Sequence, residues 1–288
     1  MIDLSSLFNL LPNFAPLECL QARFMQQALV GLLLIAPMAA AMGVQVVNFR
    51  MAFFAEAISH SAFAGVALGL LFSISPYWTM PVFGLLVGLS IMTLQRRSAL
   101  STDTVIGVIF AAVMAFGLAI VSRERNVARD LQRFLYGDIL TITDAEIGAL
   151  AALFVVIMVF QVCGYNRMLY IGLNPAVAVT HRVCVAFYQY AFAGLLALVV
   201  MLSVWAVGVL LMSALLIVPA AAARNFARSA GHMFWWAILV STTSAIAGLL
   251  ISAQNWARTA TGPTVVLCGF AWFIVSYAVA AARRQARK

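Results

Sequence analysis

Charged residues are scarce in this sequence of 288 residues. Asp, Glu, Lys and Arg make up 9% of the chain, whereas 65% of its residues are hydrophobic and its mean hydropathy is +1.03. A single soluble core cannot use so much apolar surface, and long runs with few charges are typical of membrane spans. The sequence therefore predicts an all-α polytopic membrane protein that lies in a lipid bilayer and has no nucleic-acid partner.

Lysine is almost absent, because the only one is Lys288. A phosphate-binding P-loop ends in Lys followed by Ser or Thr, so this chain cannot form a Walker A site. The G-x-S-x-G and HExxH motifs of hydrolases are also missing. We therefore expect no enzymatic activity and no cofactor bound by this chain, and any ATP that drives transport has to be bound by a separate subunit.

Cysteine is rare as well, and none of the four residues belongs to a CxxC pair. Cys163, Cys184 and Cys268 lie in or beside apolar runs, and Cys19 lies near the N-terminus. This usage argues against a disulfide framework and against a thiolate metal site. We interpret the cysteines as small apolar fillers.

Polar residues divide the chain into segments of roughly 20 residues, the length needed to cross about 30 Å of hydrocarbon. We expect nine spans. Eight remain an alternative, because residues 202–208, "LSVWAVG", would have to turn without a charge or a proline. The predicted spans are 27–48, 51–74, 78–95, 104–122, 146–164, 183–203, 205–223, 234–253 and 263–281.

The N-terminus lacks the basic region of a cleaved signal peptide, because Asp3 and Glu18 precede the first basic residue, Arg23. The spans themselves should direct insertion, with residues 1–26 as a leader. Arginines in short loops mark the cytoplasmic side. A cytoplasmic tail "RRQARK" with nine spans places the leader outside, and it places these arginines inside: Arg50, Arg96, Arg97, Arg167, Arg182, Arg224 and Arg228.

One segment, residues 122–146, breaks this rule, because it falls outside and yet is basic. Its arginines are Arg123, Arg125, Arg129 and Arg133. Either the segment is an ordinary basic cytoplasmic loop and the topology is wrong, or it is an external docking surface for an acidic protein. In the second case, charge complementarity would set the orientation and the association rate of the partner.

A carboxylate and an imidazole lie inside the second predicted span, in "FFAEAISHSAFAGVALG", residues 53–69. Glu56 and His60 share a helical face with Cβ atoms about 6 Å apart. Counted from Arg50, they lie roughly 9 Å and 15 Å into the span. An ionised Glu there costs about 3 kcal/mol, so the pair should face the protein interior. Ser61, Gly65 and Gly69 form a small-residue stripe on which another helix can pack.

These two side chains suit Zn²⁺, Mn²⁺ or Fe²⁺, and two ligands per subunit would give four across a two-fold axis. Glu56 and His60 could instead be a hydrogen-bonded pair that holds helices together, or the proton relay of a secondary transporter. The half-length symmetry of many secondary transporters is not evident. An intramembrane hydrolase using Ser59 or Ser61 lacks the expected motif.

Five motifs, in order along the chain, carry a resemblance to a known family. They are "FRMAFFAEAISHSAFAGVALG", "TDTVIGVIFA", "FLYGDILTIT", "VGVLLMSALLIVPAAAAR" and "TGPTVVL". The chain resembles the permease subunit of bacterial metal-ion ABC importers, the ABC-3 family of the zinc, manganese and iron class. Its sequence motifs are most similar to those of the zinc permeases. The family carries Asp where this chain has Glu56, and we expect the longer side chain to alter the site geometry or the metal preference.

The resemblance implies a type II importer-like permease fold in the bacterial plasma (inner) membrane, with residues 27–288 as one transmembrane permease domain. It implies a second permease subunit, identical or a paralogue, two cytoplasmic ABC ATPases and an extracytoplasmic metal-binding protein. Residues 122–146 would then lie outside, beneath the binding protein, where the four arginines would pair with its carboxylates. Glu56 and His60 would hold the transported metal ion.

Residues 166–182, "NRMLYIGLNPAVAVTHR", match in position the family's short cytoplasmic helix that couples to the ATPase. Asn174 can cap such a helix, Pro175 suits its first position, and Ala176 to Arg182 continue it. Pro175 and Thr180 depart from the acidic residue and the glycine that the family usually carries there. A plain surface helix at the bilayer edge is the alternative interpretation.

Overall fold

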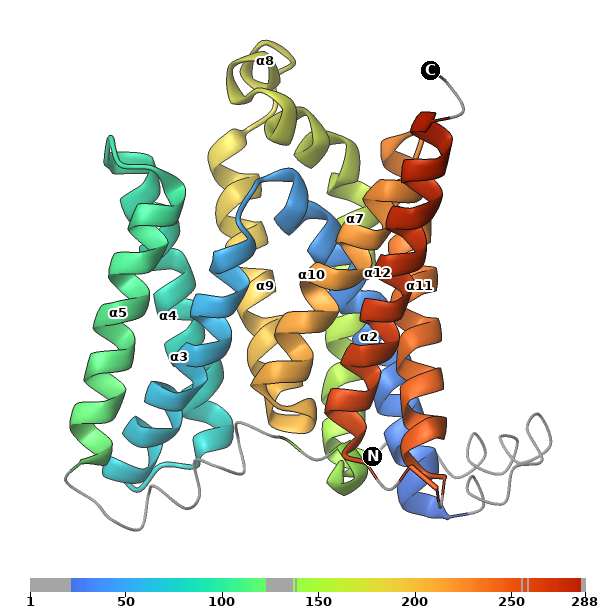
Figure 1. Cartoon of the computed structure of the whole chain (residues 1–288). Coiled ribbons are helices and arrows are strands. Elements are labelled where there is room, and N and C mark those ends of the chain that lie inside the picture. The colour runs from blue at the N-terminus through green and yellow to red at the C-terminus, as the bar shows by residue number, and fades with distance from the viewer. Residues whose placement is uncertain (1–21, 123–136, 138, 255, 258, 286–288) are drawn as a thin grey trace.

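The protein forms a bundle of long helices, seen in a computed structural model (Figure 1). The structure describes residues 22–122, 137, 139–254, 256–257 and 259–285. In these residues, nine helices are long and apolar enough to cross a membrane, which confirms nine spans rather than eight. The long helices are α2 (Arg23–Asn48), α3 (Ala52–Leu71), α4 (Pro76–Arg97), α5 (Thr102–Val121), α7 (Asp144–Leu173), α9 (Val185–Val207), α10 (Val209–Phe226), α11 (Ala230–Ser252) and α12 (Thr261–Gln285). Two short helices are η2 (Ile139–Thr141) and α8 (Pro175–Thr180).

Basic residues gather at one end of the bundle, which we call the α8 end. Figure 1 shows α8, the corner between α4 and α5 and the last turn of α12 at this end. The last turns of α4 and α12 each carry two arginines, Arg96 with Arg97 and Arg283 with Arg284. Cations at the C-terminal end of a helix also interact favourably with the helix dipole.

Helix α2 lies at the centre of the bundle and packs closely against α10. A Cβ atom added at Gly43 would lie 1.9 Å from the carbonyl oxygen of Leu216, so only glycine allows the two backbones this approach. Small residues at helix crossings are the usual means of tight packing in membranes. The position of α10 is therefore fixed to α2 by backbone contact.

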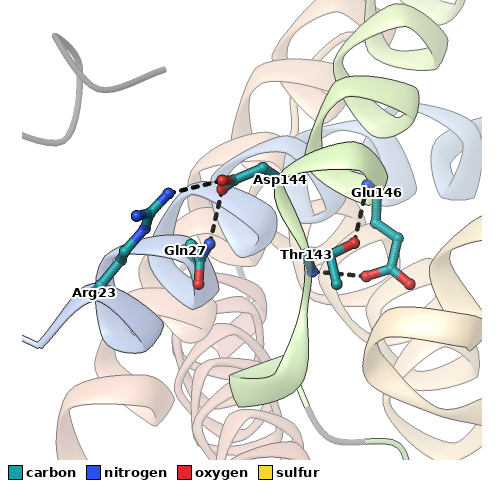
Figure 2. A network of polar contacts seen from close by, with 5 residues as sticks. All are labelled: Arg23, Gln27, Thr143, Asp144 and Glu146. Atoms are coloured by element: carbon teal, nitrogen blue, oxygen red, sulfur yellow. Dashed lines mark hydrogen bonds and ion pairs between the residues drawn. The ribbon is translucent and has the colours of Figure 1, made fainter. Parts of the chain in front are cut away.

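Helix α7 is longer than the predicted span 146–164, because it begins at Asp144 and also includes residues 166–173, which we had assigned to the coupling segment. The helix begins with a capping box, in which the Thr143 amide donates to Glu146 at 2.7 Å and the Glu146 amide donates to the Thr143 hydroxyl at 3.4 Å (Figure 2). No helix breaker follows until Pro175, whose ring disfavours helical geometry at Asn174. Arg167 and Tyr170 therefore lie on a continuous helix of 30 residues.

Polar contacts hold the start of α7, at the end of the bundle opposite to α8, which we call the Asp144 end. Asp144 accepts hydrogen bonds from Arg23 at 2.8 Å and from Gln27 at 2.7 Å, both on α2 (Figure 2). Glu146 accepts a hydrogen bond from the indole of Trp205 on α9 at 2.5 Å. These contacts join three helices at this end of the bundle.

The turn between α9 and α10 consists of a single residue, Gly208, with φ +83°. The predicted boundary near residue 204 is therefore shifted, because α9 continues to Val207. Glycine adopts this backbone conformation without a steric penalty, so neither a charge nor a proline is needed. Gly137, with φ +60°, packs against the turn, and a Cβ atom there would lie 2.1 Å from the Gly208 nitrogen.

Candidate metal site

The candidate site lies near the start of α3. Arg50, at φ +56°, turns the chain between α2 and α3, and Glu56 and His60 follow on successive turns of α3. The Nε2 atom of His60 lies 2.9 Å from the Oε1 atom of Glu56. The spacing of four residues therefore brings the two side chains together on one face, as predicted.

We predicted that the Glu56–His60 pair faces the protein interior, but within one chain both side chains are only partly buried. The side chain of His60 is 28% exposed and that of Glu56 is 40% exposed. One side of the pair is covered by α5, where the Phe110 ring meets the His60 ring edge-on at 5.6 Å. On another side lies α10, which contacts α3 through the Ser213 hydroxyl, 3.2 Å from the hydroxyl of Ser59. The remaining side is open, because no helix of the described residues packs over it.

Two buried serines connect the candidate site to α10. The hydroxyl oxygens of Ser213 on α10 and Ser59 on α3 are 3.2 Å apart, and both side chains are buried. Sequence reasoning considered Ser59 only as a nucleophile and missed Ser213. A serine on an apolar helix gives no signal of its partner unless the helix packing is known.

The small-residue stripe of α3 packs against α4, which confirms the prediction of a close helix neighbour. Cβ atoms at Gly65 and Gly69 would lie 2.9 Å from the Met80 Cα atom and 2.5 Å from the Thr79 hydroxyl. Thr79 donates a hydrogen bond to the Gly65 carbonyl at 2.8 Å. The stripe and the Glu56–His60 pair thus contact different helices, and α4 is not the helix that covers the pair.

The donor set can be stated for the part of the chain that the structure describes. Those residues contain no group of three or more His, Cys, Asp or Glu side chains that could hold a metal ion. Glu56 and His60 provide one carboxylate and one imidazole, and a tetrahedral zinc site needs four ligands. The other two histidines lie elsewhere, His181 after α8 and His232 in the first turn of α11. Within the described residues, Glu56 and His60 alone therefore cannot complete a tetrahedral zinc site.

Helix α8 confirms the predicted short helix after Asn174, but it ends at an earlier residue than predicted. The Asn174 side chain accepts a hydrogen bond from the Ala176 amide at 2.9 Å, and Pro175 occupies the first helical position. The helix ends at Thr180, whose hydroxyl donates to the Val177 carbonyl at 2.7 Å, and not at Arg182 as predicted.

The physical reason for the early end is the backbone that follows Thr180. Arg182 has φ +56°, and its amide donates to the Val179 carbonyl while the Val183 amide donates to the Ala178 carbonyl. Left-handed residues with such hydrogen bonds terminate helices. The His181 ring stacks on Tyr170 of α7 at 5.2 Å, which holds the end of α8 against α7.

The predicted docking arginines, Arg123, Arg125, Arg129 and Arg133, lie outside the described residues. Their arrangement stays a prediction from the sequence.

Nine membrane-crossing helices in the described residues and a polar pair inside one of them define an integral membrane protein of the permease class. The comparison with family models agrees with this class. Residues 21–280 match the ABC 3 transport family, and the chain belongs to that family. It is a multi-pass protein of the bacterial inner membrane.

Relatives in this family carry names of metal uptake systems. The chain is 33% identical over 249 residues to the high-affinity zinc uptake system membrane protein ZnuB of Haemophilus influenzae, covering 86% of this chain and 95% of that one. It is 28% identical over 265 residues to the manganese import system permease protein ScaB of Streptococcus gordonii, covering 92% and 94%.

Solved structures have the same fold. PsaBC from Streptococcus pneumoniae, solved in complex with a Fab, matches with a TM-score of 0.76 at 27% identity and covers 89% of this chain and 91% of that one. An inward-facing metal-chelate type ABC transporter matches with a TM-score of 0.70 over 87% and 84%. Its 17% identity supports the fold alone.

Proposed function

We propose that this chain is the permease subunit of an ATP-driven importer that moves a divalent metal ion into the cytoplasm. Zn²⁺ is the first candidate, and Mn²⁺ and Fe²⁺ are the alternatives. The observation that carries the proposal is the Glu56–His60 pair, held 2.9 Å apart inside a membrane helix of an ABC 3 family chain. Oxygen and imidazole nitrogen are ligands that all three ions accept.

The open side of the pair supports a site shared between two permease subunits. A carboxylate left facing lipid is costly, so another polar surface has to cover Glu56. A second permease, identical or a paralogue, would bring its own carboxylate and imidazole, giving four ligands across a two-fold axis. A transport site must also release its ion, and a water molecule in place of one protein ligand would lower the affinity of the site for the ion.

The two ends of the bundle differ in charge, and we use this difference to propose where each partner binds. We place the α8 end in the cytoplasm, where two ABC ATPases would bind α8 through Asn174, Pro175, Ala176 and Thr180. Its many arginines support this orientation. The leader, residues 1–26, and residues 122–146 would then lie outside, where the metal-binding protein docks. Residues 27–288 would act as one permease domain.

A proton-coupled secondary transporter is the second candidate, because the hydrogen bond between Glu56 and His60 also suits a proton relay. Zinc uptake into proteoliposomes separates the two. The chain is reconstituted with an ABC ATPase and a metal-binding protein from the same bacterium, and ATP or a proton gradient is supplied separately. Uptake that needs ATP and persists with a protonophore supports the importer, whereas uptake driven by the gradient without ATP would establish the secondary transporter.

The docking surface predicts a salt-dependent effect of Arg129→Glu. This change reverses one charge of the external segment, so the association rate of the binding protein should fall about tenfold at low salt and less at high salt. Surface plasmon resonance on the purified transporter measures the association rate at low and at high salt. Arg228→Glu, at the α8 end, is the matched control and should leave the association rate unchanged at both salt concentrations.

Two results would contradict the docking surface. One is an unchanged association rate for Arg129→Glu. The other is chemical labelling of a cysteine introduced at position 129 from the cytoplasmic side alone, which would make the segment a cytoplasmic loop.

A further inference from the structure

We infer that Arg96 and Tyr190 are positioning residues that couple α8, the proposed ATPase-binding helix, to α3, which carries the metal site. The inference rests on the proposed function, because it assigns the coupling between the ATPases and that site to particular contacts. Arg96 lies in the last turn of α4 and Tyr190 in the second turn of α9, so both lie near the α8 end.

Helix α8 is tied to the helices that precede and follow it along the chain (Figure 1). The His181 ring, directly after α8, stacks on Tyr170 of α7 at 5.2 Å. The Arg167 guanidinium of α7 donates a hydrogen bond to the Tyr188 hydroxyl in the first turn of α9. These contacts hold the end of α7, α8 and the start of α9 together. A displacement of α8 is therefore expected to move the start of α9 as well.

The start of α9 is in turn bound to α4. Arg96 donates a hydrogen bond to the Gln189 side chain at 2.9 Å, and its guanidinium lies 5.8 Å from the centre of the Tyr190 ring, close enough for a cation–π contact. The Tyr190 hydroxyl lies 3.1 Å from that of Thr93. Thr93 donates its own proton to the Leu89 carbonyl at 2.7 Å, so Tyr190 is the donor to Thr93. Polar contacts thus fix α9 to the last two turns of α4.

Helices α4 and α9 both pack against the turn of α3 that carries the metal site. Ile58 lies between Glu56 and His60 in sequence and is fully buried. A Cβ atom added at Gly88 of α4 would lie 3.2 Å from the Ile58 Cδ1 atom and 3.4 Å from the Ala193 carbonyl oxygen of α9. Close-packed elements transmit displacements to one another. A shift of α9 and α4 at this point is expected to move the α3 backbone between Glu56 and His60.

A cavity makes this indirect connection necessary. Its volume is about 180 Å³, and it is lined by Pro175 at the start of α8, by Met51 directly before α3 and by Gln189 of α9. An empty space offers no partner atoms, so Pro175 cannot push directly on Met51 across it. The contacts of Arg96 and Tyr190 provide a packed connection around the cavity.

The test measures zinc uptake and ATP hydrolysis together, in proteoliposomes that contain the complete transporter. Tyr190→Phe should lower the number of zinc ions taken up per ATP about threefold, and Arg96→Ala, which removes two contacts, about tenfold. ATP hydrolysis, zinc affinity and co-purification with the ATPase should stay within about twofold of the wild type. Arg97→Ala, in the same turn of α4, and Tyr277→Phe, 64% exposed on α12, are the matched controls and should leave the ratio unchanged.

A double variant separates a specific contact from a general loss of packing. Thr93→Val removes the acceptor of the Tyr190 hydroxyl and should lower the ratio as much as Tyr190→Phe does, and the combination should lower it no further. An unchanged ratio in Tyr190→Phe or Arg96→Ala, equal losses in the controls, parallel losses of uptake and hydrolysis, or independent effects in the double variant would each overturn the inference. Absence of ATP-dependent zinc uptake by the wild type would instead refute the proposed function.

Discussion

Replacing Glu56 by Gln is expected to reduce metal uptake by more than 100-fold, and replacing His60 by Ala should do the same, because each change removes a ligand of the metal site that we propose. Gln has the shape of Glu and keeps a polar group at this position, so helix packing should not change. The measurement is ATP-dependent uptake of radioactive zinc and manganese by proteoliposomes that contain the complete transporter. Co-purification with the ATPase should stay at the wild-type level.

Two control variants match these changes outside the candidate site. Asp103→Asn neutralises a carboxylate in the first turn of α5, and His232→Ala removes an imidazole in the first turn of α11. Both should retain uptake within about twofold, since neither residue lies beside Glu56. Wild-type uptake by the double variant Glu56→Gln with His60→Ala would show that the pair does not hold the transported ion.

The largest effect on stability is expected for Gly43→Ala. Its added methyl group would lie 1.9 Å from the Leu216 carbonyl oxygen and 2.8 Å from the carbonyl carbon, so backbone rather than a flexible side chain would have to move. Overpacking of this kind costs about 3 kcal/mol. The free energy of unfolding, or the midpoint of thermal unfolding in detergent, measures the loss.

Gly107→Ala provides the matched control for this prediction. It is the same change in the middle of a membrane helix, α5, where nothing lies within 4 Å of an added Cβ atom. Alanine is also the better helix former, so this variant should be as stable as the wild type or slightly more stable. An equal change of stability in both variants would show that the α2–α10 contact does not control the outcome.

The parts of the fold that local chemistry controls could be predicted from the sequence. Hydropathy located the nine long helices of the described residues, since a span needs about 20 apolar residues. The spacing of Glu56 and His60 predicted their contact, because helical geometry alone determines it. Asn174 and Pro175 likewise predicted the start of α8, because capping depends on adjacent residues.

Features that depend on packing between distant segments could not be predicted. The contact between Ser213 and Ser59 joins α10 to α3, and neither helix signals the other in its sequence. The partial exposure of Glu56 depends on which helices fail to cover it. The extension of α7 to Leu173 had a local cause, the absence of a helix breaker before Pro175, but the arginine at position 167 favoured a loop.

The unbroken length of α7 connects the two ends of the bundle. Thirty residues span about 45 Å, which exceeds the hydrocarbon thickness of about 30 Å, and only the extended Asn174 separates the helix from α8. Asp144 and Glu146 bind its first turn to α2 and α9. If that turn stayed fixed, a tilt of about 5° would move the far end of the helix by roughly 4 Å, which is most of a helical turn.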